Sequence, residues 1–93
     1  MIIGVVRFGL HLPGAGSLKD KRRILLSLKD RIKNKFNVSV AELEDNELWQ
    51  KSVIGVAVIS NDKKHANAVL TKTTNLVESH PEIVVSEIQM EWL

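Results

Sequence analysis

The segment SLKDKRRILLSLKDRIKNKF, residues 17–36, combines a helix start signal, an apolar stripe and a concentration of positive charge. Ser17 is a favoured N-cap residue, and Asp20 stands three positions later in a near capping-box arrangement. Leucine and isoleucine then recur at helical spacing, which predicts an amphipathic helix that runs to about Asn34. Eight of the thirteen Lys and Arg residues and two of the eleven acidic residues lie in this segment. The segment therefore carries +6 and the rest of the chain −4, so the net charge of +2 hides an uneven distribution.

The segments on either side of this helix have the patterns of β-strands. Residues 2–12 are rich in apolar and β-branched side chains and stop at Pro13-Gly14-Ala15-Gly16, which predicts a strand and then a loop. Residues 36–44 alternate apolar and polar side chains, with a change of parity near Glu42 that indicates a β-bulge. A turn is predicted at Asp45-Asn46.

The second half of the chain has the same order of elements with a different sequence. Residues 48–60 include VIGVAVIS, which is apolar on both parities and predicts a central strand. Ser60-Asn61-Asp62 offers N-cap side chains, and apolar residues follow at helical spacing until Pro81 ends the helix. Residues 82–93 alternate again and predict the last strand.

The order strand, helix, strand, strand, helix, strand predicts an α+β, ferredoxin-like βαββαβ fold. Such a fold has an antiparallel four-stranded sheet, here in the order 4-1-3-2, with both helices on one face. At 93 residues the chain has room for one hydrophobic core. We therefore expect residues 1–93 to form a single domain.

The sheet face that the helices leave uncovered is predicted to be partly apolar. Strand parity assigns Ile3 and Val5 of the first strand, and Ile83 and Val85 of the last, to this face. A contiguous apolar patch usually marks an interface, so these residues are candidates for a homodimer contact. The alternative is a small stripe that the twist of the sheet and neighbouring side chains cover.

Composition excludes several kinds of site. The chain has no cysteine, which rules out disulfides and thiolate metal sites and is compatible with the cytoplasm. No apolar run approaches the roughly 20 residues of a membrane span, and no secretion signal is recognisable. His11, His65 and His80 occur singly, without the spacing of metal ligands. We expect no metal, no cofactor and no small-molecule substrate.

One acidic cluster leaves a catalytic alternative open. Glu42, Glu44 and Asp45 lie around the predicted middle turn, where carboxylates can bind Mg²⁺ or act as acid and base. A solvated hairpin has the same composition, and no catalytic constellation accompanies the cluster. The sequence therefore favours a protein that is not an enzyme.

The first helix offers a candidate binding surface for anions. On a helical wheel five cations lie opposite the apolar stripe, and Lys21 projects toward it instead. These cations can contact successive phosphates of a nucleic acid, and such binding would depend on salt concentration and little on nucleotide sequence. The alternative is that the charged helix face is only solvated. Because VIGVAVIS has no aromatic residue, base stacking on the sheet, as in RRM domains, is poorly supported. The candidate residues are Lys19, Arg22, Arg23, Lys29 and Lys33.

The segments SLKDKR, FNVS, AE and WQ, at residues 17–22, 36–39, 41–42 and 49–50, resemble the DUF503, or YlxP-like, family of small bacterial proteins. The resemblance implies a ferredoxin-like fold and a cytoplasmic protein without an established activity. It also implies genes that often lie beside those for translation initiation and ribosome maturation, which favours RNA or the ribosome as the partner. The leading hypothesis is a non-enzymatic module that binds RNA through its first helix. The alternative is a homodimerisation or protein-interaction module that uses the apolar sheet face.

Overall fold

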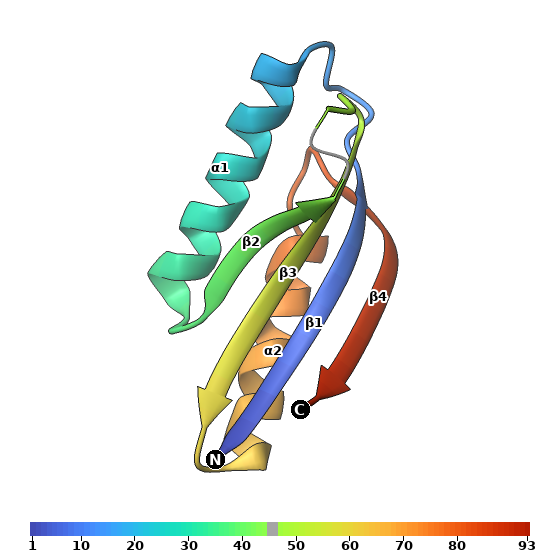
Figure 1. Ribbon diagram of the computed structural model, residues 1–93. Coiled ribbons are helices and arrows are strands. Elements are labelled where there is room, and N and C mark those ends of the chain that lie inside the picture. Colours follow the sequence, from blue (N-terminus) through green and yellow to red (C-terminus); the bar gives the residue numbers. More distant parts are fainter. Residues whose placement is uncertain (45–46) are drawn as a thin grey trace.

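Four antiparallel strands form one sheet, and two helices cover one of its faces, in the computed structural model, which describes residues 1–44 and 47–93 (Figure 1). The strands lie in the order β2-β3-β1-β4, which confirms the predicted order and the ferredoxin-like fold. The turn predicted at residues 45–46 falls outside the described residues. The elements are β1 (Ile2–His11), α1 (Leu18–Lys35), β2 (Ser39–Glu44), β3 (Lys51–Ser60), α2 (Lys63–Glu78) and β4 (Val84–Trp92).

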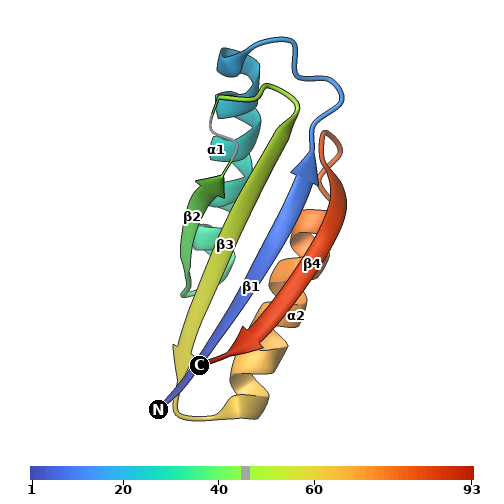
Figure 2. The same ribbon diagram turned by 45° about the vertical axis from the view of Figure 1, so that its right-hand side comes forward.

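The core lies between the sheet and the two helices. Helix α1 packs against β2, and α2 packs against β1 and β3, as Figure 2 shows from the open side of the sheet. The inward side chains of the two central strands are buried against the apolar stripes of both helices. Strand and helix periodicity place the apolar side chains of each element on one face, and these faces meet in the core. The largest of these buried side chains are Phe8, Leu10, Ile24, Leu28, Ile32, Ile54 and Leu70.

Side chains cap the start of both helices. The hydroxyl of Ser17 accepts a hydrogen bond from the amide of Asp20 at 3.1 Å, and the Asp20 carboxylate accepts one from the amide of Gly16 at 3.1 Å. In α2, the Asp62 carboxylate accepts from the amide of Lys64 at 3.0 Å. These bonds occupy amide groups that a helix start otherwise leaves unpaired. The loop before α1 is thus a capped turn.

A β-bulge in β4 overturns part of the predicted open face. Gly9 pairs with Glu87 but Leu10 pairs with Val85, so the extra residue Ser86 reverses the parity of the strand. Val85 consequently packs against the core, and Ile83, only 6% exposed, belongs to it. The prediction that Ile83 and Val85 lie on the open face is wrong.

A second bulge, in β2, confirms the change of parity predicted near Glu42. The register shifts between Glu42 and Glu44, which leaves Leu43 as the extra residue. Leu43 lies across Gly55 on the open face, with its Cδ1 2.8 Å from the position that a Cβ on Gly55 would occupy. A Cβ at residue 55 would therefore displace the Leu43 side chain from this position.

Candidate functional site

The outer face of α1 carries the five candidate cations, and four of them have no carboxylate partner among the described residues. Lys19, Arg22 and Lys33 are exposed, and Lys29 is half-buried. At 1.5 Å per residue, the positions from 19 to 33 span about 21 Å along the helix. Among the described residues, none of these four side chains forms an ion pair with a carboxylate. We call this set the basic stripe.

The fifth candidate, Arg23, is already engaged by a carboxylate. Its two terminal nitrogens donate to the two oxygens of Glu82 at 3.3 and 3.1 Å. This hydrogen bonding raises the pKa of Arg23 and lowers the pKa of Glu82. Arg23 therefore links α1 to the turn before β4, and the structure does not leave it available with the other four.

Lys21 lies apart from the basic stripe, as the helical wheel predicts. Its side chain is buried, and its Nζ donates to the carbonyl of Leu48 at 2.6 Å and lies 3.2 Å from the Oε2 of Glu42. The hydroxyl of Ser52 donates to the same carboxylate oxygen at 2.7 Å. A buried ammonium needs such partners to offset its loss of hydration. The cluster fastens β2, β3 and the segment at residues 47–50 to the start of α1.

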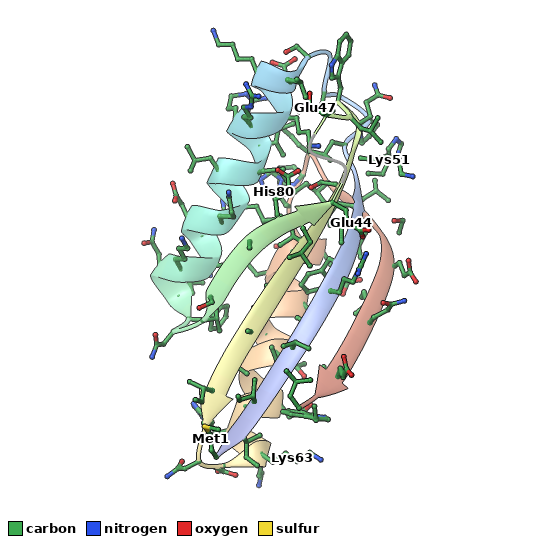
Figure 3. All side chains as sticks on the ribbon, viewed as in Figure 1. Met1, Glu44, Glu47, Lys51, Lys63 and His80 are labelled. Carbon is green, nitrogen blue, oxygen red and sulfur yellow. The ribbon has the colours of Figure 1, made fainter. Side chains whose placement is uncertain are left out.

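The structure disperses the described part of the acidic cluster. Glu42 faces Lys21 on the helix side of the sheet, whereas Glu44 pairs with Arg7 on the open side (Figure 3). Asp45 lies outside the described residues. Within residues 1–44 and 47–93, no group of three or more His and acidic side chains is placed to hold a metal ion.

The three histidines occupy different environments. His11 and His65 are exposed, whereas His80 is 4% exposed and lies behind the sheet (Figure 3). The Nδ1 of His80 accepts a hydrogen bond from the amide of Glu82 at 3.2 Å. Burial, followed by the nearby positive charge of Arg31, lowers the pKa of His80. This histidine therefore helps to close the turn before β4.

The open sheet face contains a hollow of about 450 Å³. Its lining includes Val5, Leu43, Gly55 and Ala57. Ile3 and Val5 stay on this face, as parity predicts, and both are half-buried. Leu43 is 49% exposed, and Ile59, which pairs with Ile3, is 64% exposed. The face thus combines apolar side chains with Arg7, which pairs with Gly55 across the central strands, and with Gln89 and Glu91 of β4.

A second hollow, of about 530 Å³, lies beside the segment before β3. Trp49 lines it and is 53% exposed, although a half-buried tryptophan is the commoner case at the start of a strand. The sequence offers a weak signal for this exposure, because Gln50 and Lys51 follow Trp49 and Glu47 lies two positions before it, although Leu48 is apolar. The remaining lining residues are His11, Glu47, Leu48, Gln50 and Lys51.

In the described part of the chain, neither helix is long and apolar enough to cross a membrane.

Comparison with known proteins agrees with the resemblance seen in the sequence. The family described as "Protein of unknown function (DUF503)" matches residues 3–90. The "Uncharacterized protein YlxP" of Bacillus subtilis (strain 168) is 36% identical over 91 residues, which cover 98% of this chain and 99% of the relative.

Two solved structures share the fold at low sequence identity. The de novo designed protein Foldit4 aligns with a TM-score of 0.57 and 10% identity, over 100% of this chain and 97% of the other. A C-terminal segment of the alpha subunit of aIF2 from Pyrococcus abyssi aligns with a TM-score of 0.51 and 15% identity, over 98% of this chain and 48% of the other. At such identities the likeness concerns the fold alone.

Proposed function

The chain belongs to the DUF503 family of proteins of unknown function, and from this premise we propose that it is a non-enzymatic module that binds RNA through the outer face of α1. The observation that carries the proposal is the basic stripe. Its four cations lie on the outer face of α1 and have no carboxylate partners among the described residues. The proposed partner is the ribosome or another ribonucleoprotein of the cytoplasm.

The physics of the stripe supports a polyanion as ligand. Lysine and arginine side chains that replace the counterions of phosphates give affinity that falls as salt rises. Two other cations of α1 already have carboxylate partners: Arg23 pairs with Glu82, and the buried Lys21 pairs with Glu42. The four cations of the stripe form no ion pair with a described carboxylate, and phosphates of a nucleic acid backbone would offset their charge.

A binding measurement with charge-neutralising variants tests the proposal. The probe is a fluorescein-labelled oligouridylate of roughly 12 nucleotides, followed by anisotropy at about 50 mM salt. Arg22→Ala and Lys33→Ala should each weaken binding several-fold. Lys64→Ala, which removes an exposed cation from α2, is the matched control and should leave the affinity unchanged. Absence of binding at this salt concentration, or equal losses in all three variants, would contradict the proposal.

The apolar open face favours a second candidate function, a homodimer formed face to face. Four strands about 4.8 Å apart and up to ten residues long present roughly 600 Å² per partner, at the lower bound of specific interfaces. The exposed side chains of Ile59 and Leu43 would be buried in such a contact. A weak dimer is therefore the proposed form.

Sedimentation equilibrium at micromolar to millimolar protein tests this second candidate. Ala57→Lys places a charge in the lining of the hollow and should leave a monomer. Arg22→Ala, on the opposite side of the molecule, should not change the oligomeric state. A wild-type monomer across this concentration range would exclude the dimer.

A further inference from the structure

Trp49 forms an exposed aromatic surface at the end of the molecule where α1 begins. The segment that carries it leads into β3, and Figure 3 shows Glu47 of this segment beside the start of α1. The hollow beside the indole, about 530 Å³, also has His11 and Lys51 in its lining. These two residues pair across the ends of β1 and β3.

The backbone beneath the indole is held by several hydrogen bonds. The side-chain amide of Gln50 donates to the carbonyls of Pro13 and Ala15 at 3.4 and 3.2 Å. The Gln50 carbonyl accepts from the amide of Leu12 at 2.9 Å. On the other side of Trp49, the carbonyl of Leu48 accepts from the buried Nζ of Lys21 at 2.6 Å. The exposed ring therefore sits on a fixed segment, which reduces the entropy lost when a ligand stacks on it.

The bond between Leu48 and Lys21 places the segment that carries Trp49 at the end of α1 where the basic stripe starts. Lys21 belongs to the first turns of α1, which also carry Lys19 and Arg22. The described lining of the hollow beside Trp49 contains two residues with basic side chains, His11 and Lys51, and one acidic residue, Glu47. A flat apolar ring beside cations matches a nucleotide, which has an aromatic base attached to a phosphate.

We propose that a base of single-stranded RNA stacks on Trp49 while the neighbouring phosphates contact the start of the basic stripe. This inference rests on the proposed RNA binding and specifies its substrate class as single-stranded RNA. Every base has a π face, so stacking selects unpaired nucleotides with little preference for sequence. Phosphates alone would not distinguish a single strand from a duplex, whereas a base paired within a duplex cannot reach the indole.

The chain contains a built-in control in its second tryptophan. Trp92 lies at the other end of the sheet, where its ring packs over Gly4 and the Nζ of Lys63 lies 5.1 Å from the ring centroid. Since the sequence has two tryptophans and no tyrosine, Trp92→Phe leaves Trp49 as the source of indole fluorescence. Its emission then reports stacking directly.

The test combines fluorescence with affinity. Titration of the Trp92→Phe protein with oligouridylate should quench the emission of Trp49, and Trp49→Ala in the wild-type background should weaken binding about 5- to 150-fold. Trp49→Phe, which keeps an aromatic face, should recover part of the loss. A sugar-phosphate strand of equal length without bases should bind the wild type and Trp49→Ala equally, because it has nothing to stack.

The outcomes separate this inference from the function on which it rests. If Trp49→Ala leaves the affinity for oligouridylate unchanged, the proposed stacking is overturned and the proposed phosphate contacts of α1 stand. A loss that is equally large for the strand without bases would also overturn it. Absence of any RNA binding by the wild-type protein would overturn both. If Trp92→Phe fails to fold, the affinities of the Trp49 variants decide the question alone.

Discussion

The Nζ of Lys21 lies 3.2 Å from the Oε2 of Glu42, and this ion pair joins the start of α1 to β2 inside the protein. The lysine side chain is 2% exposed and the carboxylate 24%, so solvent screens the pair little on the lysine side. Removal of one partner leaves a charge that lacks its counterpart in a partly dry site. The pair thus fixes the geometry from which both the basic stripe and Trp49 project.

Lys21→Met should lower the free energy of unfolding by about 3 kcal/mol, because it leaves the Glu42 carboxylate without its cation. Urea denaturation measures the change. The double variant Lys21→Met with Glu42→Leu removes both charges and should recover most of the loss. A single variant as stable as the wild type would show that the ion pair does not hold α1 to β2.

Gly4→Ala should destabilise the fold by about 2 kcal/mol. A Cβ at this position would lie 2.6 Å from the Trp92 ring and 2.9 Å from Leu70, so both would have to move. Gly14→Ala is the matched control, since nothing lies within 4 Å of its Cβ position. Thermal unfolding of both variants checks the difference, and equal melting temperatures would refute the packing of Trp92 on β1.

His80→Asn should reduce the dependence of stability on pH. Burial lowers the pKa of His80 in the folded protein, so the unfolded chain binds a proton more readily as pH falls through about 6.5. Stability due to this group is therefore present above that pH and decreases below it. Urea midpoints at acid and neutral pH should differ more in the wild type than in the variant. Asparagine retains an acceptor for the amide of Glu82, and an unchanged difference would contradict the assignment.

Glu82→Gln should tighten RNA binding several-fold. The substitution removes the charge that holds Arg23, so the guanidinium becomes available to a phosphate next to the basic stripe. The change in stability should be small because the pair is solvent-exposed. Anisotropy with labelled oligouridylate measures the affinity, and weaker binding than wild type would place Arg23 outside the RNA contact.

The sequence predicted the fold well because strand and helix periods repeat over long segments. The failures have local causes. Ser86 adds one residue to β4, and no feature of the alternating pattern marks that bulge, so Val85 was assigned to the wrong face. A helical wheel places Arg23 correctly on α1 but contains no information about Glu82, which is 59 residues away. The sequence correctly predicted that Lys21 lies apart from the basic stripe, because the face of a helix on which a residue lies follows from its position in the sequence.

Trp49 shows a different limit of the sequence. Its residue type is compatible with a core position and with an exposed surface, and the choice depends on hydrogen bonds between segments far apart in the chain. Gln50 bonds to Ala15 across 35 positions, and Lys21 bonds to the carbonyl of Leu48 across 27. Such contacts follow from the tertiary structure.

The salt dependence of RNA binding tests the central claim most directly. For four phosphate contacts to a single strand, a plot of log affinity against log salt concentration between about 50 and 200 mM should have a slope near −3. The double variant Arg22→Ala with Lys33→Ala should reduce the magnitude of this slope by about 1.4. Binding with the same slope in wild type and double variant, or no binding at the lowest salt, would contradict RNA recognition by α1.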